Sequence, residues 1–180
     1  AGCDNIEVVD PATGTVLRQF SVGNGTNPQD IAIVSSTRAY VSRYETNELL
    51  EVDLVTGARV DSISLASFAD GDGLCEMHRL HLRGRRLFVQ LQRMARHAWP
   101  DPWVPEPPSM LAVVDIDTGQ LVDADPAVAG VQAVALAGTN PIAPIVEDPE
   151  NGDLLVPEAG RYGVIDEAGI ERVNPLSLRS

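Results

Sequence analysis

Three acidic residues near the middle of the chain could bind a metal ion. Asp70, Asp72 and Glu76 stand two and four positions apart in a glycine-containing segment. Carboxylate oxygens are the hard ligands that Ca²⁺ prefers, so this spacing is compatible with a calcium site. An acidic surface turn rich in glycine has the same composition and binds nothing. We favour the surface turn and expect no cofactor, with Ca²⁺ at these three residues as the alternative.

Two histidines follow this segment, His78 and His81. Side chains three positions apart on a β-strand point to opposite faces, so the pair is not expected to share a metal ion. We interpret His78 as a histidine held between neighbouring sheets, and ligand binding is the alternative role that we keep for it.

A second cluster combines aromatic and cationic residues between positions 93 and 103, where both tryptophans of the chain occur. Aromatic faces beside cations could form a lip that binds a sugar or a carboxylate. The alternative is a proline-stiffened loop that folds over its own strands. The candidate ligand-binding residues are therefore Arg93, Arg96, His97, Trp99, Trp103 and His78.

The sequence contains no positive sign of catalysis. A G-x-S-x-G nucleophile motif is absent. The glycines at positions 23 and 25 precede a strand pattern rather than a helix, which excludes a phosphate-binding loop. We name no catalytic residue, and we expect a protein that is not an enzyme, while leaving that question open.

The charge and the apolar runs of the sequence exclude two classes of partner. The 180 residues carry 13 basic against 26 acidic side chains, a net charge of −13. Such a charge repels nucleic acid and anionic lipid at long range. No apolar run reaches the roughly 18 residues of a membrane-spanning helix, so neither nucleic acid nor a membrane span is expected.

The elements that must position these residues are strands in a repeated pattern. A β-rich run followed by Asp and a turn ending in Gly recurs at residues 6–14, 49–57 and 111–119, with a weaker copy at 170–175. Asp and Asn cap such turns, and Gly adopts the positive φ that they require. We therefore predict equivalent caps at Asp10, Asp53 and Asp115.

A second phrase aligns residues 27–45 with residues 75–93, 48 positions later, and a third copy begins at residue 140. Each unit then holds four short strands, which we name A to D, with repeats near 6–48, 49–110 and 111–169 and a partial one at 170–180. Loop insertions are expected at 94–108 and 160–169, both between strands B and C. Four strands per unit with a period in the forties are typical of a β-propeller blade.

Residues 39–47 and 52–57 resemble the repeat of YVTN-type β-propellers, and residues 72–77 with 84–93 resemble uncharacterised propeller lipoproteins of GC-rich bacteria. The resemblance implies an exported protein, periplasmic or on the cell surface, and Ala1-Gly2-Cys3 resembles the end of a lipoprotein cleavage box. It implies no known reaction, and the haem-attachment motif C-x-x-C-H is absent.

The pattern contains thirteen strands and both begins and ends at strand C. We therefore predict an all-β fold that is an incomplete β-propeller, about three four-stranded blades plus an extra strand. The expected context is a six- to eight-bladed ring, completed by further blades or by another copy of the chain. Cys3 and Cys75 lie two blades apart, and a disulfide requires Cα atoms within about 7 Å, so no bridge is expected between them.

In a propeller the D-to-A and B-to-C connections emerge on one face, which brings segment 70–78 and insertion 94–108 together. The functional hypothesis is an exported, non-enzymatic propeller module that binds a protein, a glycan or another ligand on that face. The alternative is a substrate- or cofactor-binding subunit of a lactonase-like or quinoprotein-like enzyme.

Overall fold

The computed structural model describes residues 4–96 and 103–180. Within those ranges the regular structure is almost entirely antiparallel β-strand, and helical residues are confined to two 3-10 turns, η1 (Ala66–Phe68) and η2 (Ile165–Glu167). None of these residues belongs to a helix long and apolar enough to cross a membrane. The all-β prediction is confirmed.

The strands of the repeat form four successive sheets, each a simple up-and-down meander, and β9 and β10 form a separate two-stranded sheet. Sheet 1 contains β1 (Asn5–Val9) and β2 (Val16–Ser21), and sheet 2 contains β3 (Pro28–Ile33), β4 (Arg38–Arg43), β5 (Glu48–Asp53) and β6 (Arg59–Ser64). Sheet 3 contains β7 (Met77–Arg83), β8 (Arg86–Leu91), β11 (Met110–Asp115) and β12 (Gln120–Leu121), and sheet 4 contains β14 (Val146–Glu147), β15 (Leu154–Glu158) and β16 (Gly169–Val173).

Three further short strands lie outside the repeat. The strands β9 (Met94–Arg96) and β10 (Trp103–Pro105) pair with each other between β8 and β11, and β13 (Val134–Ala135) pairs with the start of β11. Without these three, the described chain has the thirteen strands of the predicted pattern, in the predicted order.

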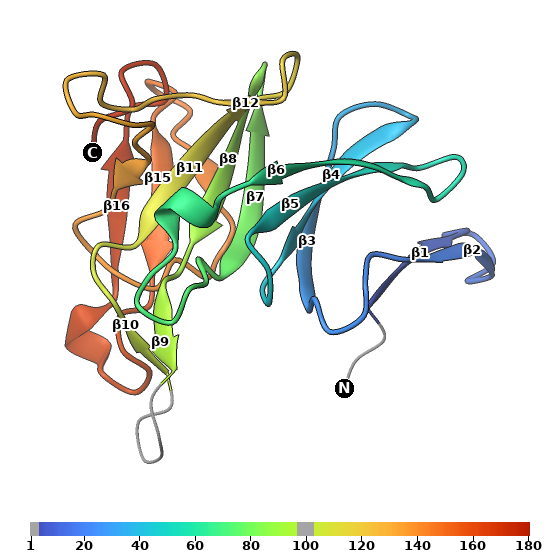
Figure 1. The fold of residues 1–180 in the computed structure, drawn as a ribbon, viewed down its shortest axis with the longest axis horizontal. Helices are drawn as coiled ribbons and strands as arrows, with labels where there is room; N and C mark the ends of the chain where they lie inside the picture. The colour runs from blue at the N-terminus through green and yellow to red at the C-terminus, as the bar shows by residue number, and fades with distance from the viewer. Residues whose placement is uncertain (1–3, 97–102) are drawn as a thin grey trace.

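The sheets follow one another as an open arc, from β1 and β2 at one end to β15 and β16 at the other (Figure 1). The fold is an incomplete β-propeller in which the ring is not closed. The end sheets expose apolar side chains, including Leu17 on β2 and Ile170 on β16, at 65% and 70% exposure.

Alternating residues pack each inner sheet against both neighbours. On β4, Tyr40 joins the core between sheets 2 and 3, whereas Ala39 and Val41 join the core between sheets 1 and 2. On β8, Val89 faces sheet 2 and Phe88 faces sheet 4. A strand buried on both faces requires an almost continuous apolar run, which explains why these segments lack strict hydrophobic alternation.

One feature of sheet 3 differs from the simple repeat. The position of strand D is occupied by two short pieces, β12 near the turn and β13 at the other end of β11, and residues 122–133 loop out between them. The sequence analysis placed both insertions between strands B and C and did not anticipate this excursion.

The capped turns are confirmed. The Oδ1 atom of Asp53 accepts hydrogen bonds from the N–H groups of Val55 at 2.8 Å and Thr56 at 2.7 Å. Asp10, Asp115 and Asn174 accept equivalent bonds from residues two or three positions later. The fourth turn ends in Leu178 rather than Gly, with φ of +57°.

Arginines at the start of strand B link adjacent sheets. Arg38 donates to the carbonyl oxygen of Ile116 in the turn after β11, at 2.7 Å, and Arg86, 48 positions later, donates to that of Pro175 in the turn after β16. The repeat therefore encodes contacts between sheets as well as strands.

Candidate functional site

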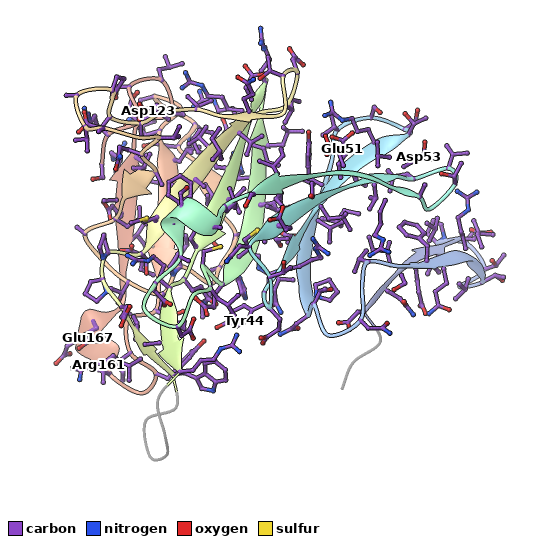
Figure 2. All side chains as sticks on the ribbon, viewed as in Figure 1. Tyr44, Glu51, Asp53, Asp123, Arg161 and Glu167 are labelled. Carbon is purple, nitrogen blue, oxygen red and sulfur yellow. The ribbon has the colours of Figure 1, made fainter. Side chains whose placement is uncertain are left out.

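The loops between successive strands lie at two opposite ends of the sheets, as the propeller pattern predicts. Figure 2 shows Tyr44, at the end of β4, and the pair Arg161 and Glu167 toward the end that carries β9 and β10, whereas Asp53 and Asp123 lie toward the opposite end. Segment 70–76 and the β9–β10 hairpin meet at the first end, since Arg96 contacts Asp72 at 3.5 Å. We call this end the insertion face.

A pocket of about 360 Å³ opens on the insertion face. Its lining comes from three consecutive sheets and from the β9–β10 pair: Asn27, Gln29, Tyr44 and Glu45 in or beside sheet 2, His78 and Gln92 in or beside sheet 3, Trp103 on β10, and Tyr162 beside sheet 4. Each of these residues stands at the end of an A or B strand or in an adjoining loop. The pocket therefore exists only because the sheets are arranged around a common axis.

Aromatic side chains form much of the wall. The ring of Trp103 meets that of Tyr44 edge to face, with centroids 6.5 Å apart and an interplanar angle of 73°. The guanidinium of Arg96 lies 5.4 Å from the Trp103 ring centroid and pairs with Glu45 at 2.6 Å. Arg96 thereby fixes two walls of the pocket, while Trp103 keeps 42% of its surface exposed.

His78 lines the same pocket. Its Nδ1 atom is buried and has no hydrogen-bond partner in the described part of the chain. Burial, together with the nearby charge of Arg79, lowers the pKa of His78, so the ring is neutral near pH 7. His81 has different surroundings, with Nε2 at 3.1 Å from a carboxylate oxygen of Glu147. As expected, the two histidines do not converge.

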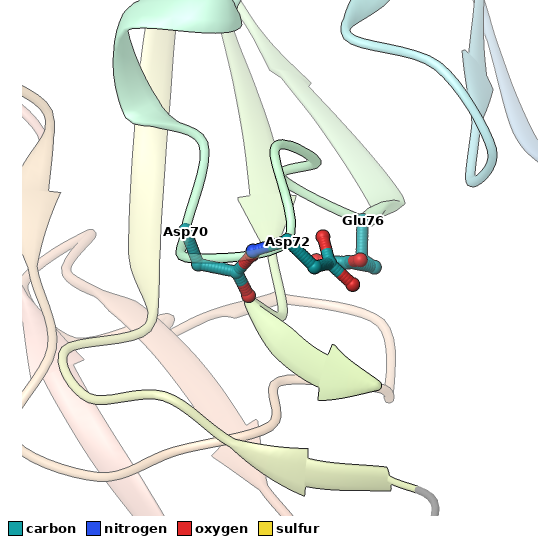
Figure 3. Close-up of side chains that lie close together, drawn as sticks. All are labelled: Asp70, Asp72 and Glu76. Atoms are coloured by element: carbon teal, nitrogen blue, oxygen red, sulfur yellow. The ribbon is translucent and has the colours of Figure 1, made fainter. Parts of the chain in front are cut away.

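Beside the pocket, segment 70–76 brings three carboxyl groups together. Asp70, Asp72 and Glu76 each offer an oxygen, and these oxygens lie within 4.8 Å of one another (Figure 3). The Oδ1 atoms of Asp70 and Asp72 also accept local backbone hydrogen bonds, at 3.1 and 3.0 Å, which shape the turn.

Glu76 is the unusual member, because its side chain is fully buried. Its Oε2 atom accepts a hydrogen bond from the Met94 N–H at 3.1 Å, which joins the segment to β9. Burial first, and then the charges of Asp70 and Asp72, raise the pKa of Glu76 to about 8, against the opposing effects of the Met94 bond and Arg96. Burial also raises the pKa of Asp70.

The predicted aromatic and cationic cluster is only partly assembled in one place. Trp103 lines the pocket and Arg96 braces it, but Arg93 points elsewhere and donates to the carbonyl oxygen of Pro108 at 2.8 Å. His97 and Trp99 fall outside the described residues.

Most of the polar lining was missed from sequence. Tyr44 and Gln92 are equivalent positions of the repeat, 48 residues apart, at the ends of β4 and β8. That equivalence is a signal that the sequence offered, since loop-proximal ends of repeated strands gather around the propeller axis. Asn27, Gln29 and Tyr162 carried no comparable signal.

Comparisons with known proteins identify a fold and no family. No family model matches the chain, and no curated protein matches it in sequence. A protein of unknown function from Bacteroides caccae is 14% identical with a TM-score of 0.58, and the match covers 97% of this chain and 52% of that one.

A putative 6-phosphogluconolactonase from Bacteroides fragilis is 16% identical with a TM-score of 0.55, over 95% of this chain and 48% of that one. BamB from Moraxella catarrhalis is 12% identical with a TM-score of 0.47, over 96% and 42% of the two chains. The chain spans about half the length of the two Bacteroides proteins, and identities this low establish similarity of fold alone.

Proposed function

We propose that this chain is part of an exported, non-enzymatic β-propeller module that binds an uncharged glycan in the pocket of the insertion face. The observation that carries the proposal is the lining itself: three aromatic rings, three side-chain amides, a carboxylate and a neutral histidine around about 360 Å³. Aromatic faces pack against the C–H faces of sugars, and amides and carboxylates exchange hydrogen bonds with hydroxyl groups.

The charge of the site favours a neutral ligand. Neither Arg nor Lys is among the described residues that line the pocket. The nearby guanidinium of Arg96 is already paired with Glu45 and also approaches Asp72. With a net charge of −13 on the chain, an anionic sugar would meet repulsion and no free cation. Export is supported by the resemblance described above.

Saturation-transfer NMR and calorimetry against a panel of neutral oligosaccharides test the proposal. Trp103→Ala should weaken binding at least about fivefold, because removing a buried or stacked Trp commonly costs more than 1 kcal/mol of binding free energy. Gln29→Ala should also weaken binding. The matched control is Gln19→Ala, an exposed glutamine on β2 outside the pocket, which should leave affinity unchanged. Absence of saturable binding to every neutral glycan would refute the proposal.

A second candidate is a hydrolase that acts on a sugar lactone in the same pocket. A neutral His78 in the pocket lining favours it, since an imidazole that faces the pocket could accept a proton from an attacking water. Turnover of a neutral aldonolactone that is lost in His78→Ala, with the fold intact, would establish this candidate. Binding without turnover supports the non-enzymatic module.

A further inference from the structure

Glu76 has a feature that a solvated acidic turn lacks. Its side chain is fully buried, and its Oε1 atom has no hydrogen-bond donor among the described residues. The Glu76 side chain offers an oxygen to the group formed with Asp70 and Asp72 (Figure 3). A buried carboxylate oxygen without a hydrogen-bond donor destabilises the fold, because it loses its hydrogen bonds to water and gains none in return. A ligand that supplies positive charge at that point would remove the cost.

The guanidinium of Arg96 lies nearby but does not bind Glu76 Oε1 closely. Arg96 approaches Glu76 Oε1 only to 3.9 Å and Asp72 to 3.5 Å, while its 2.6 Å contact is with Glu45. One guanidinium is therefore shared among Glu45, Asp72 and Glu76, and the buried Oδ2 of Asp70 has no hydrogen-bond partner among the described residues. The segment keeps carboxyl oxygens that no described cation contacts closely.

We propose that Asp70, Asp72 and Glu76 bind one Ca²⁺ ion at the junction of segment 70–76 and β9. Two oxygens bound to the same Ca²⁺ lie at most about 5 Å apart, so oxygens within 4.8 Å of one another can reach one ion. Mg²⁺ requires a near-ideal octahedron and gives up its water reluctantly, so the irregular set of three side chains favours Ca²⁺. Water would complete the coordination shell, as is usual for sites with few protein ligands.

The ion would hold two parts of the insertion face together. Glu76 already contacts the backbone of Met94 through Oε2, and Asp70 and Asp72 shape the turn that leads into β7. Binding at the free oxygens would therefore tie the turn to β9. The backbone of Glu76 adjoins the pocket, because its carbonyl oxygen accepts a hydrogen bond from the N–H of Gln92 at 3.1 Å. None of the three carboxylate side chains is among the described residues that line the pocket, so the ion can be tested without the glycan ligand.

Calorimetric titration of the chelator-treated chain with CaCl₂ is the test, together with thermal melts with and without Ca²⁺. We expect one saturable site with a Kd on the order of 0.1 to 1 mM, as in extracellular calcium modules, and a rise in Tm that Mg²⁺ reproduces poorly. In Glu76→Gln, which preserves the side-chain shape and removes the carboxylate, the affinity for Ca²⁺ should fall at least tenfold. The rise in Tm on adding Ca²⁺ should become smaller.

Two further variants make the outcome decisive. Glu158→Gln is the matched control, because Glu158 lies in sheet 4 and is also buried, with an Oε1 atom that has no hydrogen-bond partner in the described part of the chain. This variant should bind Ca²⁺ like the wild type. Asp72→Asn changes a side chain nearer the surface and should lose the ion even if Glu76→Gln fails to fold. No saturable Ca²⁺ binding, or unchanged binding in Asp72→Asn, would overturn the proposal.

Discussion

The turn that ends in Leu178 sets two physical effects against each other. Equivalent turns place glycine at this position, with φ near +70° at Gly14, Gly57 and Gly119, whereas Leu178 adopts φ of +57°. A residue with a Cβ in this region is strained by about 1 kcal/mol or somewhat more relative to Gly. In return, the Leu178 side chain is 95% buried in the core between sheets 3 and 4.

Truncation separates the two effects. Leu178→Ala loses the burial and keeps the strain, so it should lower the free energy of unfolding by about 2–5 kcal/mol. Leu178→Gly loses the same burial but relieves the strain, so it should be about 1 kcal/mol more stable than Leu178→Ala. This order is the reverse of the usual one for alanine and glycine.

Urea unfolding followed by circular dichroism measures the difference between the two variants. Leu154, buried in the same core on β15, supplies the control pair. On a regular strand, glycine lowers the free energy of unfolding by roughly 0.5–1 kcal/mol relative to alanine. Leu154→Gly should therefore be less stable than Leu154→Ala. If Leu178→Ala proves at least as stable as Leu178→Gly, the account of the turn is wrong.

Three other predictions concern stability and reactivity. Asp53→Ala should cost on the order of 1 kcal/mol of unfolding free energy through loss of its cap and leave glycan binding unchanged, and a loss of affinity without a loss of stability would contradict the structural role. Burial and the adjacent Glu171 raise the pKa of Glu158 to about 7, so the folded state keeps a proton that the unfolded state releases. Unfolding free energy should therefore fall as pH rises from about 4.5 to 7. Glu158→Gln should reduce this dependence and leave the part that Glu76 contributes, because the pKa of Glu76 is raised in the same direction, to about 8; an unchanged pH profile in the variant would exclude Glu158 as a cause. Burial raises the pKa of the Cys75 thiol to about 12, so iodoacetamide at pH 8 should label Cys75 only after unfolding, and rapid labelling in the native chain, assigned by peptide mapping to Cys75 and not to Cys3, would show that the Cys75 thiol is accessible.

Local features of the fold were readable from the sequence because they depend on residues close together in the chain. An Asp that caps a turn bonds to residues two or three positions later, as Asp53 does, and the pattern therefore marks every turn after strand C. The period of the repeat fixed the number and order of the strands. The excursion at residues 122–133 escaped because its β12 and β13 flanks are only two residues long and have no strand pattern.

The candidate sites depended on distances between sheets. Sequence analysis selected Trp103 and His78 but could not pair Trp103 with Tyr44, 59 positions earlier, or bring Tyr162 to the same pocket. Sequence analysis also selected Asp70, Asp72 and Glu76, but it could not distinguish a solvent-exposed acidic turn from a buried carboxylate cluster. The decisive fact is the burial of Glu76, which follows from the packing of β9 over it. Local sequence determines which side chains are offered, and only the packing of successive sheets determines which of them lose their water.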